Sequence, residues 1–457
     1  MTVAFRSIQS GDMVGLHAYI ESKLPPKDLE KKQFGEVFTP LTLVTEMLDA
    51  IDKYADKDFW KNPDLKILDP AAGIGNFPLV AYEKLMVGLK GKIPQEAMRK
   101  KHILENMLYM VELNGNNVRL MKKIFGGDKY KLNIVKGDFL EDKTHKKLLD
   151  KLGTKELKFD LVMGNPPFSK STSRDSSATS TGKIWQDFVT IGISFLCKEG
   201  YLTMISPQSW RQTIADSGGR SKDYITMRSK QILYLSMYDA TQSKNIFQVP
   251  MDFDWYVIKN VRPSLRTYVR DTEDKTYKVS LDKLPFLPSK HWDVICKYLT
   301  IDEDCVDLIY DRTAFGSDKK YVVRESSDEY KYPIVHVITS RATTLLWTNK
   351  ENKVSKGKHM FGVSKVIITK SSGNKIENVI IDRKGKYGLS QNVFAFAIDE
   401  TTSNETLKEF LLGPMFLNII QATKGGGMFI DHRIFKNFKK NFWNISEDRL
   451  DSKVCAF

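Results

Sequence analysis

The sequence predicts an α/β protein with two parts: a Rossmann-like, mostly parallel sheet first and an α+β domain after it. Between residues 34 and 260, short apolar segments alternate with helical patterns, which is typical of a parallel sheet covered by helices on both faces. At 457 residues the chain also exceeds what one hydrophobic core usually organises. We therefore expect more than one domain.

The order of the patterns divides the chain into three segments. Residues 1–33 contain a helical pattern and a charged run, and we expect an N-terminal helical arm or cap. Residues 34–262 hold the alternating strands and helices. After Val261-Arg262-Pro263 the sequence becomes rich in Thr, Ser, Lys and aromatic residues and loses the alternation. Residues 263–457 are therefore expected to form the second domain.

The first clear strand, at residues 65–69, leads through a turn of small residues into an apolar helix pattern from Phe77 to Leu85. Gly73 and Gly75 in this turn let the backbone approach a ligand closely. No Gly-Lys-Ser/Thr follows, which argues against a P-loop. Position 78 is Pro, so the third glycine of a dinucleotide site is missing. A ligand-binding turn of another class and an ordinary tight turn both remain.

The next two strands lead to acidic residues. The apolar run 107–111 ends at Glu112, and the run 132–135 leads to Asp138 and Phe139. In a Rossmann-like sheet, a carboxylate in the position of Glu112 usually binds ribose hydroxyls. Asp138 would lie at the same edge, within reach of an adenine amino group. Each acid alone is more often a helix cap or a solvated loop residue, but their order favours ligand binding.

The most informative segment is Asn165-Pro166-Pro167-Phe168, which follows the apolar strand 159–164. The Asn165 side-chain oxygen and the Pro166 carbonyl are two acceptors that can face the two hydrogens of an exocyclic amino group. They would stabilise positive charge as it develops on that nitrogen. Phe168 would stack on a base swung out of a duplex. The alternative is a strand end followed by a rigid Pro-Pro turn.

Together these motifs resemble the series found in S-adenosylmethionine-dependent amino-methyltransferases that act on DNA. Phe38-Thr39-Pro40 comes first and the target-recognition region comes last, which resembles the gamma arrangement. That arrangement is typical of adenine-N6 enzymes from restriction-modification systems. The resemblance covers residues 34–260. It implies a methyltransferase domain that binds S-adenosyl-L-methionine, followed by a DNA target-recognition domain.

The resemblance also implies a role for each motif residue. Thr39 and Pro40 would line the cofactor pocket, and the turn after the first strand would hold the methionine end. Asp138 and Phe139 would bracket the cofactor adenine. The implied cofactor-binding set is Phe38, Thr39, Pro40, Asp69, Ala71, Gly73, Gly75, Glu112, Asp138, Phe139 and Asn165. The implied catalytic set is Asn165, Pro166, Pro167 and Phe168, and no metal is implied.

Phe247 and Val249 precede the last apolar strand of the first domain. They are expected either to hold the extruded base or to pack in the core.

The charge balance favours a polyanionic partner. The formal net charge is +14, and residues 331–457 alone contain 20 Lys and Arg against 11 Asp and Glu. Excess positive charge attracts phosphates without reading bases, so double-stranded DNA is the expected partner. A solvated lysine-rich surface is the alternative. The candidates for DNA contacts are Arg341, Trp347, Lys365, Lys370, Arg383 and Arg433.

Several other classes are disfavoured. No segment approaches 18 uninterrupted apolar residues and the N-terminus lacks a signal-peptide core, so a protein that is not secreted and has no membrane partner is expected. Its location would be the cytoplasm, or wherever the target DNA resides. The four cysteines lack metal-binding spacing and are expected to be reduced thiols. No nuclease array of the Pro-Asp…Asp/Glu-x-Lys type is evident, so cleavage would need a separate cognate restriction endonuclease.

The expected function is that of a site-specific, adenine-specific DNA methyltransferase. It would transfer a methyl group from S-adenosyl-L-methionine to the N6 amino group of a flipped-out adenine in duplex DNA. Methylation of cytosine N4 in DNA, or of adenine N6 in RNA, is an alternative within the same chemistry. A specificity or binding module without catalysis is an alternative of a different class, against which Asn165, Glu112 and Asp69 argue.

Overall fold

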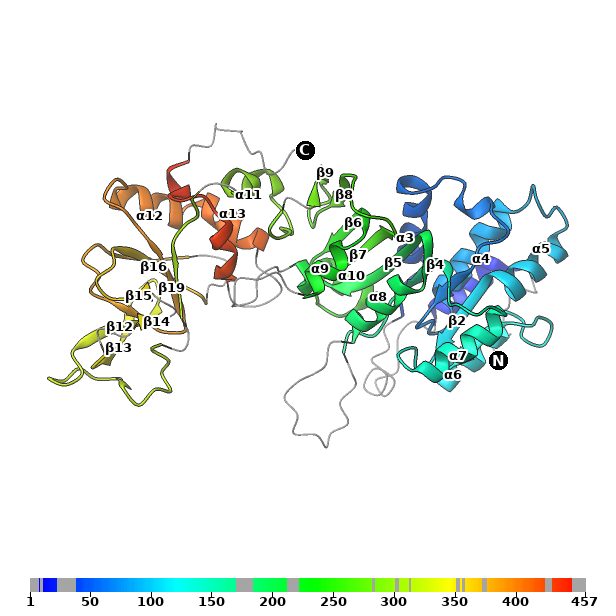
Figure 1. The fold of residues 1–457 in the computed structure, drawn as a ribbon, viewed down its shortest axis with the longest axis horizontal. Coiled ribbons are helices and arrows are strands. Elements are labelled where there is room, and N and C mark those ends of the chain that lie inside the picture. The colour runs from blue at the N-terminus through cyan, green and yellow to red at the C-terminus, as the bar shows by residue number, and fades with distance from the viewer. Residues whose placement is uncertain are drawn as a thin grey trace. The chain divides into compact units, whose positions relative to one another are not determined.

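The computed structural model describes residues 8, 11–22, 38–169, 184–211, 222–281, 284–300, 304–311, 314–350, 354–355, 358–371, 376–423 and 430–445. These residues form two compact units, both drawn in Figure 1. The first unit runs to Trp210 and continues from Lys222 to Val279. The second contains Arg211 and the part of the chain that follows Val279.

The first unit alternates helices and strands, as the sequence predicts. Its helices are α1 (Met13–Glu21), α3 (Leu41–Tyr54), α4 (Asn76–Gly88), α5 (Glu96–His102), α6 (Gly115–Ile124), α7 (Asp142–Leu152), α8 (Trp185–Ser194), α9 (Lys222–Arg228) and α10 (Ala240–Phe247). Its strands are β1 (Ile67–Asp69), β2 (Leu108–Glu112), β3 (Asn133–Lys136), β4 (Phe159–Gly164), β5 (Leu196–Pro207), β6 (Gln231–Tyr238), β7 (Phe253–Lys259), β8 (Thr267–Arg270) and β9 (Thr276–Val279).

These strands form one sheet in the order β3-β2-β1-β4-β5-β7-β6-β8-β9. Strands β1 to β5 pair in parallel, whereas β7 is antiparallel to both of its neighbours. The mostly parallel, Rossmann-like sheet is therefore confirmed. The strand order reverses at β1, with β2 on one side and β4 on the other. In open α/β sheets, ligands bind outside the carboxyl ends of the strands at such a reversal.

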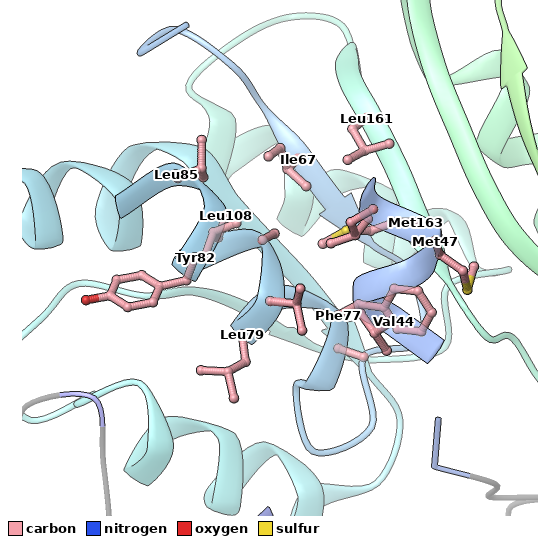
Figure 2. Close-up of a cluster of buried hydrophobic side chains, with 14 of the residues drawn as sticks. Val44, Met47, Ile67, Phe77, Leu79, Tyr82, Leu85, Leu108, Leu161 and Met163 are labelled. Carbon is pink, nitrogen blue, oxygen red and sulfur yellow. The ribbon is translucent and has the colours of Figure 1, made fainter. Parts of the chain in front are cut away.

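Burial explains why the central strands read as continuous apolar runs. Every residue of β1 and β2 is buried, as expected for parallel strands that are covered on both faces. Figure 2 shows the core beside these strands, where Val44 and Met47 of α3 approach Phe77 of α4. The described part of the expected N-terminal arm contributes to the same core, because Leu16 and Ile20 of α1 are buried in it.

The first unit extends past the boundary that composition predicted at residues 262 and 263. Strand β8 adds to the sheet in parallel with β6, and β9 folds back on β8. The residues that resembled a new domain form a sheet edge, where Thr276 and Lys278 are exposed. An exposed edge strand carries polar residues on its open side, which is why its composition differs from that of the buried strands.

The second unit mixes strands and helices, in agreement with the expected α+β class. Its strands are β10 (Leu308–Ile309), β11 (Val322–Val323), β12 (Tyr332–Ile338), β13 (Thr343–Thr348), β14 (Val354–Ser355), β15 (Lys358–His359), β16 (Lys365–Thr369), β17 (Ile380–Asp382), β18 (Gly388–Leu389) and β19 (Val393–Ala397). Its helices are α11 (Trp292–Tyr298), α12 (Asn404–Leu412) and α13 (Pro414–Thr423). Two four-stranded sheets, β10-β19-β16-β17 and β11-β13-β12-β18, organise it.

Two of the candidate DNA contacts, the buried Lys365 and the half-buried Arg383, form hydrogen bonds within this unit. Lys365 is 0% exposed and its Nζ lies 2.8 Å from Asp382 Oδ2, so the expectation of a surface contact is wrong. Burial lowers the pKa of Lys365, and the hydrogen bond to Asp382 opposes that shift. Arg383 donates to Asn404 Oδ1 at 3.0 Å and to the Asp399 carbonyl at 2.6 Å. The sequence suggested that both side chains could reach DNA, because a basic residue is normally exposed.

The cysteines differ in their bonding. Cys197 and Cys305 are free, as expected, but Cys296 is disulfide-bonded, so the expectation of reduced thiols is wrong for Cys296.

Among the described residues, no group of three or more His, Cys, Asp and Glu side chains could hold a metal ion. No helix in the same part of the chain is both long and apolar enough to cross a membrane.

We predict that Lys365→Met destabilises the second unit by about 3–5 kcal/mol, because it leaves the buried Asp382 carboxylate without its cation. Urea denaturation followed by circular dichroism measures the change. Arg341→Met is the matched control, since Arg341 is exposed and an exposed site usually changes stability by no more than about 0.5 kcal/mol. Equal stability of the two variants would contradict the assignment of Lys365 to the core.

Candidate active site

Four strand ends place polar side chains along one edge of the sheet. Asp69 is the last residue of β1, Glu112 is the last residue of β2, and Asn165 follows β4 directly. Asp138 lies two residues beyond the end of β3. Because these four strands are parallel neighbours, their carboxyl ends meet at this edge. A cavity of about 460 Å³ opens there, within the size range of sites for small molecules.

The cavity brings together most of the residues that the sequence predicts. Those that line it are Phe38, Thr39, Ala71, Gly73, Glu112, Asp138, Phe139, Asn165, Pro166, Pro167 and Phe168. Phe247 and Val249, for which core packing was the alternative, also line it. Pro40, Asp69 and Gly75 do not. The residues named for the cofactor and those named for catalysis therefore share one space.

Glu112 is fixed by two backbone donors. The Gly73 N–H donates to Glu112 Oε2 at 2.7 Å, and the Asn114 N–H donates to Oε1 at 2.7 Å. The residue is 7% exposed although it lines the cavity, so its small accessible surface faces inward. The two backbone donors therefore hold the Glu112 carboxylate in a fixed orientation at the cavity wall.

The turn that carries Gly73 needs a residue without a side chain. Its φ is +56°, and a Cβ there would lie 3.1 Å from the Phe38 ring. Gly73 thus satisfies a left-handed backbone conformation and leaves room for the ring of the Phe-Thr-Pro element. A ligand can approach the backbone of this turn closely, as the sequence suggested.

Thr39 is bonded to two other residues of the cavity lining, Asn165 and Asn76. Asn165 Nδ2 donates to Thr39 Oγ1 at 3.2 Å, and Asn76 Nδ2 donates to the Thr39 carbonyl at 2.7 Å. With its amide nitrogen directed at Thr39, Asn165 has its side-chain acceptor, Oδ1, on the opposite side of the amide. The Phe-Thr-Pro element therefore orients the first residue of the Asn-Pro-Pro-Phe turn.

Aromatic rings form much of the remaining lining. Phe139 is 1% exposed and stacks on Phe188 with ring centroids 5.4 Å apart. Phe247 meets Phe253 edge to face, with a centroid distance of 5.2 Å and an interplanar angle of 70°. Asp138 Oδ1 accepts from the Leu140 N–H at 2.9 Å, which fixes this carboxylate at the end of β3. The cavity thus combines planar apolar surfaces with a few oriented acceptors.

The three predicted residues outside the lining have structural contacts instead. Pro40 directly precedes α3, and its carbonyl accepts from the Val44 N–H at 3.1 Å. Gly75 precedes α4 with a φ of +98°, and a Cβ there would lie 2.7 Å from the Phe125 ring. Asp69 is 1% exposed and its Oδ1 accepts from the Ala71 N–H at 3.0 Å. Their expected contacts with a cofactor stay predictions.

Sequence reasoning missed several residues that line the cavity. Leu113 is the clearest, because it is a 54% exposed hydrophobic residue that directly follows Glu112. Its position after a strand-end acid is a signal that could have identified it. Phe188 and Phe253 gave no such signal, since an aromatic residue in an apolar helix or strand normally packs in the core. Met251 is a further lining residue that the sequence did not reveal.

The fold and the site together define a Rossmann-like domain with a ligand-sized cavity at the reversal of strand order, and a comparison with known families shows what the chain is similar to. Residues 85–247 match the Eco57I restriction-modification methylase family. The resemblance that the motifs indicated, to methyltransferases of restriction-modification systems, is thereby confirmed.

Individual relatives are distant. An uncharacterized adenine-specific methylase of Mycoplasma pneumoniae is 26% identical over 281 residues, covering 48% of this chain and 62% of that protein. Type II methyltransferase M.BstVI of Geobacillus stearothermophilus is 27% identical over 286 residues, covering 56% of this chain and 48% of that protein. The chain therefore matches less than two thirds of the length of either relative.

Among solved structures, the Type IIL restriction-modification enzyme MmeI in complex with DNA is 12% identical to this chain. The match covers 93% of this chain and 70% of that one, with a TM-score of 0.48.

We predict that Asp69 makes the stability of the first unit depend on pH. Burial, and secondarily the charge of Glu112, raise the pKa of Asp69 well above its ordinary value, and the Ala71 N–H only partly offsets them. Folding therefore favours the protonated form. The associated stabilisation is complete below the unfolded-state pKa of about 4 and is lost as the pH rises through the folded-state pKa.

Urea denaturation across this pH range checks the prediction. The loss of stability with rising pH should be smaller in Asp69→Asn than in the wild type. Asp64→Asn, at an exposed position before β1, should leave the profile unchanged. If Asp69→Asn keeps the wild-type pH profile, the raised pKa is refuted.

Proposed function

We propose that the chain is a site-specific DNA methyltransferase that transfers a methyl group from S-adenosyl-L-methionine to the N6 amino group of an adenine rotated out of duplex DNA. The observation that carries the proposal is the shared cavity. It is lined both by the turn at Gly73 with Glu112 and by Asn165 with Pro166. A methyl transfer requires its two reactants to be held side by side.

The cofactor half of the cavity fits S-adenosyl-L-methionine. Gly73 has no Cβ, so the methionine end can lie against the backbone at this position. The oriented Glu112 carboxylate can accept hydrogen bonds from the two ribose hydroxyls. Phe139 and Leu113 offer apolar surface for the adenine, and Asp138 offers an acceptor for its amino group. When bound, the cofactor supplies a methyl carbon made electrophilic by the attached sulfonium.

The acceptor half of the cavity fits an aromatic amino group. An amino nitrogen conjugated with a purine ring is a poor nucleophile because its lone pair is delocalised. Asn165 Oδ1 and the Pro166 carbonyl can each accept one of its hydrogens and so favour a tetrahedral nitrogen. Both acceptors would stabilise the positive charge that develops as the nitrogen bonds to the methyl carbon. The bond between that carbon and the sulfonium would break in the same step, and its electron pair would stay on sulfur, which leaves S-adenosylhomocysteine. The nitrogen then loses one proton to solvent and becomes a neutral secondary amine.

The walls beside Asn165 suit a base removed from its stack. Phe168 can face one side of the base, and Phe247 with Val249 can contact it from another element. In such a site, new contacts with aromatic and apolar side chains offset the free-energy cost of unstacking the base.

Assignments outside the cavity complete the proposal. We place the DNA target-recognition domain in the second unit, beginning at residue 280 instead of 263. The partner is double-stranded DNA, and cleavage of unmodified DNA is assigned to a separate cognate endonuclease. The protein would act in the cytoplasm or wherever its target DNA resides.

The proposal is tested by incubating the protein with tritium-labelled S-adenosyl-L-methionine and unmethylated duplex DNA, and in parallel with RNA. After digestion to nucleosides, the label is expected in N6-methyldeoxyadenosine. Label in N4-methyldeoxycytidine or in RNA would replace the proposed substrate with one of the alternatives. Absence of transfer to any nucleic acid would favour a module without catalysis.

We predict that a substitution in the acceptor half of the cavity lowers kcat, whereas a substitution in the cofactor half weakens cofactor binding. Asn165→Ala should lower kcat by about 10²–10³-fold, because it removes one acceptor of developing charge. It should still bind the cofactor. Glu112→Gln should weaken cofactor binding by about tenfold or more, since a hydrogen bond to a charged group contributes about 1.5–3 kcal/mol. It should retain much of kcat at saturating cofactor.

Isothermal calorimetry with S-adenosylhomocysteine and steady-state methylation kinetics separate these effects. Asn106→Ala and Glu105→Gln are matched controls, because both residues lie just before the opposite end of β2. Neither control should change binding or kcat. Wild-type turnover by Asn165→Ala would exclude its amide from the reaction, and unchanged affinity in Glu112→Gln would exclude the carboxylate from cofactor binding.

A further inference from the structure

The sheet extension β8–β9 lies beside the element that carries Phe247 and Val249 to the cavity. Arg270, the last residue of β8, pairs with Ser236 of β6. Tyr238 is the last residue of β6, and α10 begins two residues later and ends at Phe247. The extension therefore lies next to the start of a short helix whose end forms part of the cavity lining.

Arg270 connects β8 with two other elements of the first unit. Its Nε donates to Ser236 Oγ at 2.9 Å, and its Nη2 lies 3.0 Å from Glu46 Oε1 of α3. It also donates to the Tyr238 hydroxyl, which in turn donates to Glu46 Oε2 at 3.2 Å. The guanidinium carbon lies 4.9 Å from the centroid of the Tyr238 ring. Tyr238 is thus held at its hydroxyl and across one face of its ring.

The Tyr238 ring transmits this restraint to the cavity wall. Tyr238 stacks on Phe253 with centroids 4.5 Å apart and an interplanar angle of 6°. Phe253 is 0% exposed and belongs to the cavity lining. It meets Phe247, another lining residue, edge to face. Moving the Tyr238 ring would therefore displace the surface against which Phe247 rests.

The turn after β8 also holds α10 itself. Gln242 Nε2 donates to the Thr272 carbonyl at 3.2 Å, and Gln242 forms a capping box with Asp239 at the start of the helix. At the other end, Ser243 Oγ donates to the Val249 carbonyl at 2.9 Å. An isolated helix of eight residues is unstable in water, so α10 depends on such tertiary contacts.

We propose that Arg270 is a positioning residue for the methyl-acceptor base. Through Tyr238, Phe253 and α10, the β8–β9 extension fixes the Phe247 and Val249 wall at the distance from Asn165 at which a base can be clamped. This inference rests on the proposed function for the identity of the base. The positioning of the wall itself needs no substrate and can be measured separately.

Arg270→Gln tests the proposal, with Lys259→Gln as the matched control. Lys259 lies at the opposite end of β7, 3.0 Å from Glu199 Oε2 and 5.9 Å from the centroid of the Tyr201 ring. Both substitutions remove a cation that pairs with a glutamate and lies over a tyrosine. Only Arg270 connects to the cavity wall. Loss of stability alone would therefore affect both variants in the same way.

The first readout is the ¹³C-methyl NMR signal of Met251, which lines the cavity and is assigned through Met251→Leu. Arg270→Gln is expected to shift or broaden this signal, because the neighbouring aromatic rings move, and Lys259→Gln is expected to leave it unchanged. An unchanged Met251 signal in a folded Arg270→Gln protein overturns the proposal. This readout decides the question even if the wild type proves not to methylate DNA, an outcome that would refute only the proposed function.

The second readout is kinetic. In Arg270→Gln, kcat/KM for DNA should fall by about tenfold or more, since misplacement by about 1 Å can cost 10²-fold. The affinity for S-adenosylhomocysteine should stay at the wild-type value. Equal loss of both, or loss of neither, contradicts a role specific to the acceptor wall. If Arg270→Gln does not fold, Tyr238→Phe, which keeps the stacked ring and removes the hydroxyl, is tested by the same two readouts.

Discussion

The hydrogen bond from the Gly73 N–H to Glu112 Oε2 is the interaction on which the site depends. It joins the turn after β1 to the end of β2 and so fixes the shape of the cavity at the reversal of strand order. The bond requires a backbone that approaches the carboxylate closely, and it requires a strand that delivers that carboxylate to the edge. Parallel pairing of β1 and β2 provides the second condition. The neighbouring β4 then presents Asn165 on the other side of the same edge.

The sequence predicted this edge well because its determinants are local. Each of the strands β1 to β4 is a short, largely apolar run, and each candidate site residue either ends its strand or follows it within two residues. The positions of Glu112, Asp138 and Asn165 therefore required only the rule that parallel strands end at one edge. The class of chemistry followed from residue types, since the Asn-Pro-Pro-Phe turn offers two acceptors and an aromatic ring. Asp69 shows the limit of this reasoning, because residue type gave no sign that its carboxyl is buried beneath the turn.

What the sequence did not reveal depends on contacts between distant segments. Lys365 appears as an ordinary basic residue until Asp382 is placed beside it in the adjacent strand. Phe188 and Phe253 reach the cavity only because α8 and β7 pack beside it. The β8–β9 extension was assigned to the second domain because an edge strand shares its composition with loops. In each case the deciding partner lies outside the local sequence window.

The most direct test of the central claim is a structure of the protein with S-adenosylhomocysteine and duplex DNA bound. The ribose is expected to contact Glu112, the sulfur to lie beside Asn165 and Pro166, and an extrahelical adenine to enter the same cavity with its amino group toward them. A cofactor bound elsewhere, or an Asn-Pro-Pro-Phe turn directed away from the sulfur, would contradict it.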